Sequence, residues 1–259
     1  MSNINDISTV KQQYSTANNL NRRISIHEKY STNKMGFGNW IVSNYKIDKG
    51  MKILELGCGT GDMWKNRDTL INSCSKIVLS DFSEGMLLST KNNIGIYNNI
   101  EYKVIDIQEI PFDNDEFDIV IANMMLYHVP DIQKGLSEVR RVLKNDGVFY
   151  CATYGEHGII EYLSKTLSSY GVENNINKNF TLQNGKEILG KVFSNIKKLE
   201  YIDSLAVTNI DDIVDYIYSL SGMTSLTNVP KNTIKDIFTN NLVNGVLNVP
   251  KEYGMFIAS

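Results

Sequence analysis

Three glycines at alternate positions mark the stretch of sequence best suited to bind a ligand. Residues 51–62, MKILELGCGTGD, form an apolar run that contains the acid Glu55 and passes into a loop with Gly57, Gly59 and Gly61. Glycine is needed where the backbone takes a positive φ or passes close to a ligand. A tight strand-to-helix turn would also need glycines. We nevertheless expect this loop to present its backbone to a cofactor or a phosphate group.

A second acid lies at the distance typical of a ribose contact. Asp81 ends an apolar run over 76–79 and follows Gly61 by 20 residues. In doubly wound folds a carboxylate at this spacing binds ribose, because its oxygens accept hydrogen bonds from the vicinal hydroxyls. The alternative is that Asp81, like Ser83, caps the next helix. The spacing favours ribose binding, and Phe82 is expected to line the same site.

The place of the third glycine distinguishes between cofactors. The dinucleotide fingerprint G-x-G-x-x-G would need glycine at position 62, which is Asp62. The acid followed by L-G-x-G-x-G over 55–61 resembles instead the first motif of the class I S-adenosylmethionine (SAM) dependent methyltransferases. This resemblance implies SAM as the cofactor. It places the methionine end of SAM at Glu55 and at the loop residues Gly57, Cys58, Gly59 and Gly61.

The resemblance extends to other segments. Asp106 resembles the family's acid that accepts a hydrogen bond from the adenine amino group, with Ile107 supplying the neighbouring amide, although Asp106 could simply form a turn. The run FDIVIANMMLYHVPD resembles the fourth motif of the small-molecule branch and places Asn123 near the methionine part of SAM. Tyr14 and Arg22 take the places of a Tyr and a basic residue that recur in the family's N-terminal lid. The Pro-Pro-aromatic motif of nitrogen methylases is missing, which disfavours DNA bases as acceptors.

Two side chains are candidates for catalysis. His128 follows the fourth predicted strand, where an acceptor would lie, and an imidazole titrates near neutral pH. A similar His recurs in relatives with different substrates, so the alternative is that His128 orients its loop, with Tyr127 as a wall. Cys58 could act as a nucleophile, but no His or Lys stands beside it, and we interpret it as a packing residue of the loop. No motif has metal-ligand spacing.

Alternating strand and helix patterns position these residues. Strands are predicted at 51–56, 76–80, 101–105, 117–122 and 147–153. With helices between them, they indicate βαβ units and a parallel sheet. Such sheets bind ligands beyond the carboxyl ends of their strands, where the strand order reverses. Each candidate residue after position 50 lies at or just after such an end. The best-marked helix is predicted from Asp131 to Leu143, with a stop at 145–147.

The expected organisation is a helical lid over 1–46 and a cofactor-binding core over 47–259. Within the core, residues 155–193 are interpreted as a helical insertion that shapes the acceptor pocket, with Glu156 and His157 as possible substrate contacts. The later elements are a strand at 197–207, helices at 211–220 and 230–242, and a strand at 254–258. The resemblance implies a Rossmann-like, doubly wound α/β fold. Its seven-stranded sheet should be mostly parallel, with an antiparallel last strand.

Composition limits the classes of partner. The 259 residues are 42% hydrophobic and 21% charged, which fits one large domain or a core domain with a small appendage. A net charge of −3 without long basic clusters disfavours nucleic acid and acidic membranes as partners. Three cysteines without CxxC spacing, a polar N-terminus and no apolar run of 18 residues favour a soluble protein of the cytoplasm.

The expected function is methyl transfer from SAM to a small-molecule acceptor. The motifs leave open whether oxygen, nitrogen or carbon is methylated, whether a general base takes part, and which oligomer forms. Two alternatives stay open as well. One is a SAM-binding regulator or catalytically silent protein. The other is a nucleotide-cofactor oxidoreductase, which Asp62 at the third-glycine position disfavours.

Overall fold

The computed structural model describes residues 17–220 and 225–259, and their contacts form two compact groups. Unit 1 comprises the described part of Met1–Gly36 together with Tyr154–Lys178 and Glu200–Tyr253. Unit 2 comprises Phe37–Thr153, Asn179–Leu199 and Gly254–Ser259.

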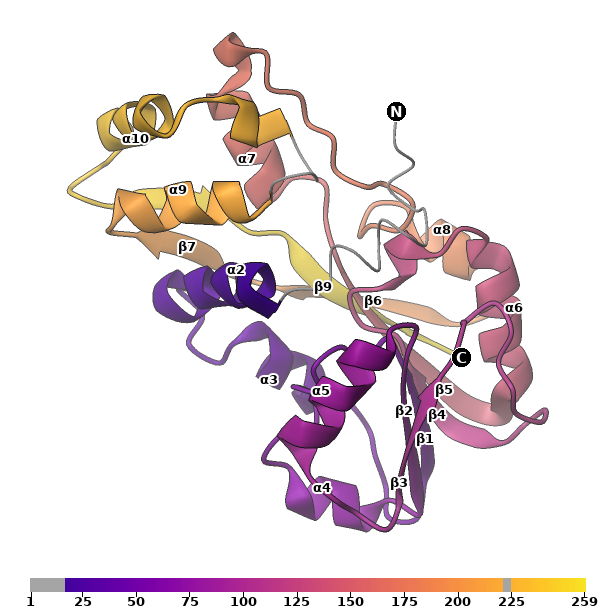
Figure 1. The fold of residues 1–259 in the computed structure, drawn as a ribbon. Coiled ribbons are helices and arrows are strands. Elements are labelled where there is room, and N and C mark those ends of the chain that lie inside the picture. The colour runs from indigo at the N-terminus through magenta and orange to yellow at the C-terminus, as the bar shows by residue number, and fades with distance from the viewer. Residues whose placement is uncertain (1–16, 221–224) are drawn as a thin grey trace. The chain divides into compact units, whose positions relative to one another are not determined.

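The larger sheet has seven strands in the order β3-β2-β1-β4-β5-β9-β6 (Figure 1). Their bounds are β1 Lys52–Leu56, β2 Lys76–Asp81, β3 Ile100–Val104, β4 Phe117–Ile121, β5 Leu143–Tyr154, β6 Ile196–Tyr201 and β9 Tyr253–Ala258. Strand β1 pairs in parallel with β2 and β4, β2 with β3, and β4 with β5. The strand order therefore reverses between β1 and β4. The expected doubly wound, seven-stranded and mostly parallel sheet is confirmed.

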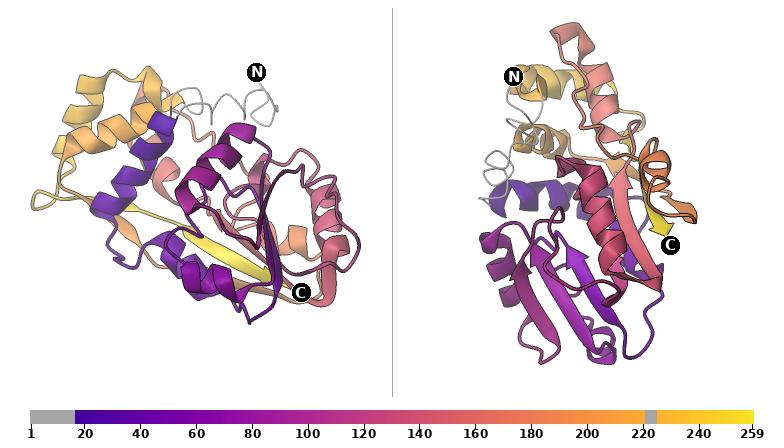
Figure 2. Two further views of the ribbon diagram at one scale, coloured as in Figure 1. Left: turned by 60° about the horizontal axis from the view of Figure 1, so that its bottom comes forward. Right: turned by 90° about the vertical axis from the view of Figure 1, so that its right-hand side faces the viewer.

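Helices of unit 2 cover both faces of this sheet (Figures 1 and 2). They are α3 Phe37–Ser43, α4 Asp68–Ser73, α5 Glu84–Ile94, α6 Ile132–Val142 and α8 Gly185–Leu189, with a short 3-10 helix η1 at Leu126–His128. On one face Ile53 of β1 belongs to a core with Ile71 of α4. On the other, Leu54 shares a core with Leu136 of α6 and Leu189 of α8. Neighbouring residues of β1 are buried on opposite faces because a parallel sheet is covered by helices on both sides.

Helix α6 begins where the sequence predicts and ends slightly early. The Asp131 side chain caps it by accepting a hydrogen bond from the Lys134 amide at 3.0 Å. The helix ends at Val142 and passes directly into β5, whose first residue is Leu143. The predicted stop at 145–147 therefore lies inside a strand, which begins four residues before the predicted start at 147.

Unit 1 is built from helices and a separate two-stranded sheet. Its elements are α2 Ala17–Tyr30, α7 Ile159–Thr166, η2 Ser168–Tyr170, α9 Ile210–Ser219, η3 Ser225–Asn228, α10 Lys231–Asn240 and the antiparallel strands β7 Ser204–Val207 and β8 Leu247–Pro250. Its core includes the fully buried Ile213 and Ile217 of α9, Leu205 of β7 and Phe238 of α10. The amphipathic pattern of the predicted helix at 211–220 therefore packs as expected.

The run 197–207, predicted as one strand, is two strands in different sheets. β6 ends at Tyr201 and β7 begins at Ser204. Between them, the buried Asp203 side chain pairs with Lys251 and accepts hydrogen bonds from Ser31 Oγ at 2.9 Å and the Asn33 amide at 2.9 Å. A buried carboxylate needs such donors. The backbone turns where Asp203 meets them, so the single-strand prediction is wrong.

No helix in 17–220 or 225–259 combines the length and apolar character needed to cross a membrane. The three cysteines, Cys58, Cys74 and Cys151, are buried free thiols.

Candidate functional site

The glycine loop follows β1 at the point where the strand order reverses. Gly57, Gly59 and Gly61 have φ of +72°, +58° and +81°, in the left-handed region that disfavours side chains. A Cβ added at Gly57 would lie 3.0 Å from the Met125 side chain, and one at Gly61 would lie 2.7 Å from Thr90 Cγ2. At Gly59 an added Cβ would meet no atom of the described part of the chain within 4 Å. Gly57 and Gly61 therefore allow the loop to pack, while Gly59 leaves open space for a ligand.

Asp81 contacts this loop directly. Its Oδ2 accepts a hydrogen bond from the Gly59 amide at 3.0 Å, and its Oδ1 accepts one from the Ser83 amide at 2.9 Å. The cap of α5 is Ser83, whose Oγ accepts from the Met86 amide at 3.4 Å. Burial raises the pKa of Asp81, and its hydrogen bonds to backbone amides oppose that effect. The sequence-predicted pair, loop and acid, is thus brought together, and the capping alternative applies to Ser83. Phe82 follows directly and is partly buried.

Glu55 is the most deeply buried acid of the site. Glu55 is only 1% exposed, and Trp64 donates its indole N–H to Glu55 Oε2 at 2.7 Å. Burial, together with the nearby charge of Asp81, raises the pKa of Glu55 to about 7, and the hydrogen bond from Trp64 opposes this shift. Sequence reasoning missed Trp64. A buried indole N–H needs an acceptor, but the sequence does not show which acid lies nearby, because that depends on how the chain packs.

Thr90 of α5 holds the glycine loop in place through its hydroxyl group. Thr90 Oγ1 donates to the Gly59 carbonyl at 2.6 Å and lies 3.5 Å from Cys58 Sγ. Burial raises the pKa of the Cys58 thiol far above neutrality. The thiol is therefore protonated and packed, in line with its interpretation as a packing residue of the loop.

Asp106 and Ile107 lie just beyond β3. Asp106 Oδ1 accepts hydrogen bonds from the Gln108 amide at 2.8 Å and from Gln108 Nε2 at 3.1 Å. Ile107 is 4% exposed and packs in the core next to Gly135 of α6. The turn-forming role of Asp106 is therefore present, and an adenine contact at the same position stays a prediction.

Asn123 joins the segment after β4 to two other parts of unit 2. Its Nδ2 donates to Tyr45 Oη at 2.7 Å, and its Oδ1 accepts from the Ala152 amide at 3.1 Å. The next residue, Met124, has φ of +55°, which is unusual for a residue other than glycine. Such strained positions gather at functional sites. Tyr45, which holds Asn123, was missed by sequence reasoning.

His128 lies at the end of η1, with its ring centroid 4.5 Å from that of Tyr127. Burial lowers the pKa of His128 to about 4. The imidazole is therefore neutral at physiological pH and able to accept a proton only weakly.

The remaining candidate residues belong to unit 1 or lie outside the residues that the structure describes. Tyr14 is outside the described residues, and Arg22 lies in α2 with its side chain outside them. Glu156 pairs with Lys178 at 2.6 Å, and His157 Nδ1 lies 3.3 Å from a Glu161 carboxylate oxygen. In the described ranges no group of three or more His, Cys, Asp or Glu side chains is arranged to hold a metal ion.

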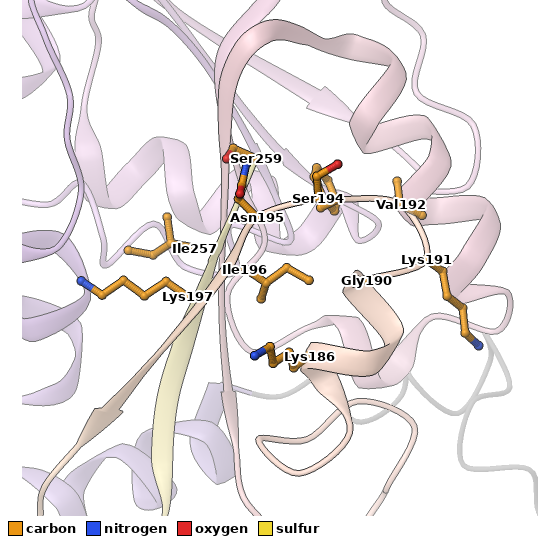
Figure 3. A pocket seen from close by; sticks show the side chains of 11 residues that line it. Lys186, Gly190, Lys191, Val192, Ser194, Asn195, Ile196, Lys197, Ile257 and Ser259 are labelled. Carbon is orange, nitrogen blue, oxygen red and sulfur yellow. The ribbon is translucent and has the colours of Figure 1, made fainter.

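A surface hollow of about 830 Å³ lies by α8, β6 and β9 (Figure 3). Its lining residues are Lys186, Gly190, Lys191, Val192, Phe193, Ser194, Asn195, Ile196, Lys197, Ile257 and Ser259. None of the candidate site residues is among them. Lys191 and Lys197 extend in opposite directions, so the lysines do not converge on one ligand (Figure 3).

The part of the chain that contains the glycine loop is similar to known methyltransferases. Residues 54–151 match the family model described as a methyltransferase domain. The ubiquinone/menaquinone biosynthesis C-methyltransferase of Escherichia coli is 33% identical over 127 residues, which are 48% of this chain and 50% of that protein. The chain thus spans about half the length of the curated relatives it matches. The resemblance of the glycine motif to SAM-dependent methyltransferases is confirmed.

Solved structures share the fold over most of the chain. The (4+2)-cyclase SpnF has a TM-score of 0.59 and 14% identity, covering 96% of this chain and 95% of its own. Phosphoethanolamine N-methyltransferase 2 of Haemonchus contortus, solved with S-adenosylhomocysteine, has a TM-score of 0.50 and 17% identity, covering 92% of this chain and 52% of its own. Identities this low establish the fold and not the activity.

Proposed function

We propose that this chain, with its methyltransferase domain at 54–151, transfers the methyl group of SAM to a small-molecule acceptor. One observation carries the proposal. The Gly59 amide donates to Asp81 Oδ2 at 3.0 Å, and among the described residues no atom lies within 4 Å of the place that a Gly59 side chain would fill. A backbone cradle and the carboxylate that we assign to the ribose therefore lie side by side at the switch point of the sheet.

The residues present fit this cofactor. The open space at Gly59 admits a ligand against the backbone, and Asp81 keeps acceptor capacity for ribose hydroxyls beyond the backbone amides that donate to it. We assign Glu55, Gly57, Cys58 and Asn123 to the methionine end. We assign Phe82, Asp106 and Ile107 to the adenosine end.

When bound, SAM supplies a methyl group on a sulfonium, which leaves as a neutral thioether. The protein's main task is then to align the acceptor with that methyl group, and well-oriented reactants gain about 7 to 11 kcal/mol. A base is needed only for an acceptor that must lose a proton. His128 is our candidate for that base, and its low pKa suits an acceptor of high acidity.

We further propose that residues 1–46, with Tyr14 and Arg22, act as a lid over the cofactor, and that 155–193 shape the acceptor pocket. The relatives named above include a C-methyltransferase and an N-methyltransferase, so the acceptor atom stays open. A cytoplasmic location is supported by the three free, buried thiols.

A SAM-binding protein without methyl transfer is the second candidate. It stays open because the glycine loop and Asp81 account for cofactor binding and not for an acceptor. An oxidoreductase is disfavoured by Asp62 at the third-glycine position of the dinucleotide motif.

Titration calorimetry with SAM, S-adenosylhomocysteine and NADH tests the cofactor assignment. We expect the first two to bind at one site and NADH to give no heat beyond dilution, because the loop lacks the dinucleotide spacing. Binding of NADH without SAM would contradict the proposal. Binding of SAM without methylation of any acceptor in a panel of small phenols, amines and activated carbon acids would favour the silent alternative.

A further inference from the structure

Among the residues that the structure describes, the carboxyl group of Glu55 is hydrogen-bonded on one oxygen only. Trp64 Nε1–H donates to Oε2 at 2.7 Å, and both residues are 1% exposed. Within the described ranges, no donor is hydrogen-bonded to Oε1. An ionised carboxylate can accept about four hydrogen bonds. A buried acid with so few donors, next to the glycine loop, indicates a donor that a ligand supplies.

Trp64 is held firmly enough to fix the orientation of this acid. Its amide donates to the Gly61 carbonyl at 2.9 Å, so the turn that leaves the loop sets its backbone position. Its indole is buried in the core that also contains Ile41 of α3 and Ile71 of α4. The indole N–H is therefore a fixed point from which Glu55 is oriented.

We propose that Trp64 is a positioning residue that presents Oε1 of Glu55 to the α-ammonium group of SAM, and that cofactor binding releases the proton of Glu55. This inference rests on the proposed function and extends it to a residue outside the glycine motif. The proton of the carboxyl group goes to solvent. The carboxylate then accepts a charge-assisted hydrogen bond from the ammonium group, which keeps its own protons.

The groups around Glu55 favour its neutral form before the ligand arrives. Asp81 at the end of β2 adds a like charge, while Cys58 and Tyr45 are uncharged because burial raises the pKa of each. Burial raises the pKa of Glu55 to about 7, and only the Trp64 hydrogen bond opposes this shift. A cationic ligand favours the ionised form, so binding and deprotonation are coupled.

The affinity for the ligand should fall as the pH falls below 7. In that range Glu55 is protonated, so the ligand must displace a proton in order to bind. With a ligand-free pKa of about 7, affinity at pH 6 should be about tenfold lower than at pH 8. Trp64→Phe removes the bond that favours the carboxylate. It should lower affinity at pH 7 by about tenfold and move the midpoint of the pH dependence upward.

Calorimetry with S-adenosylhomocysteine, which keeps the α-ammonium group and is not consumed, tests the proposal in two buffers of different ionisation enthalpy. At pH 7 the wild-type protein should release about half a proton per ligand bound. Glu55→Gln should release none. Tyr97→Phe also removes an aromatic donor from a carboxylate, that of Asp68, and serves as the matched control, with wild-type affinity and proton release expected.

A Trp64→Phe protein with wild-type affinity and an unmoved pH midpoint would overturn the positioning role, while ligand binding to the wild type would leave the proposed function intact. Proton release by Glu55→Gln equal to that of wild type would overturn the coupling. No binding by the wild type would overturn both proposals.

Tryptophan fluorescence tests the proposal even if the Trp64→Phe protein does not fold. In the Trp40→Phe protein, Trp64 is the only tryptophan left. Its emission should titrate near pH 7, the midpoint should fall on addition of S-adenosylhomocysteine, and Glu55→Gln should abolish the titration. Emission that is constant through the neutral range, with and without ligand, would overturn the proposal.

Discussion

Replacing Asp81 by alanine should lower the affinity for S-adenosylhomocysteine at least about 100-fold. The ribose would lose two hydrogen bonds to a charged acceptor, each contributing about 1.5 to 3 kcal/mol. The Gly59 and Ser83 amides would also lose their acceptors, so the loop would be less well ordered. Calorimetry measures the affinity, and thermal unfolding shows whether the variant remains folded.

Asp62→Ala is the matched control for this change. Asp62 lies on the same loop, is exposed, and accepts a hydrogen bond only from Thr60 Oγ1 among the described residues, at 2.8 Å. Its loss should change affinity by less than about twofold, as is usual for an exposed side chain away from a ligand. A folded Asp81→Ala protein that binds as tightly as wild type would show that the ribose lies elsewhere.

Alanine at Gly61 and at Gly59 should have opposite consequences. At Gly61 the new Cβ would lie 2.7 Å from Thr90 Cγ2 and 2.8 Å from Ile94 Cδ1. Thr90 cannot easily move, because it is fully buried and donates to the Gly59 carbonyl. With strain at φ of +81° added to this overpacking, we expect a loss of about 3 kcal/mol in the free energy of unfolding.

The methyl group of Gly59→Ala meets no atom of residues 17–220 or 225–259 within 4 Å, and the change should cost only about 1 kcal/mol, from the φ of +58°. The methyl group would instead occupy the space assigned to the cofactor, so the affinity for S-adenosylhomocysteine should fall about 100-fold or more. Denaturant unfolding and calorimetry on both variants separate the two effects. A stable Gly59→Ala protein with unchanged affinity would show that this space is not the cofactor cradle.

Local spacing was enough to predict the sheet and the adjacency of the glycine loop and Asp81. The acids and the glycine loop follow strands, and the carboxyl ends of parallel strands meet at one edge of the sheet. The adjacency of Gly59 and Asp81 follows from that rule, although 22 residues separate them. The fold class was predictable for the same reason, since apolar runs alternate with amphipathic helices.

The partners of the buried polar groups were not predictable from spacing. Tyr45 holds Asn123 across 78 residues, and Trp64 reaches Glu55 across nine. Both pairs exist because a buried polar atom needs a partner, and which partner it finds depends on how the helices pack. The partners of Asp203 were not predictable either. The apolar pattern continues through Asp203 as one strand, but in the structure its carboxylate binds donors at 31–33 and Lys251, and the strand ends there.

A crystal structure with S-adenosylhomocysteine bound would show whether the glycine loop and Asp81 hold SAM. We expect the ribose hydroxyls within hydrogen-bond distance of Asp81, the backbone of Gly59 against the ligand, and the adenine near Asp106 and Ile107. The polar groups that line the space beside the sulfur would then identify the acceptor site. A ligand bound away from the loop, or a ribose without contact to Asp81, would contradict the account.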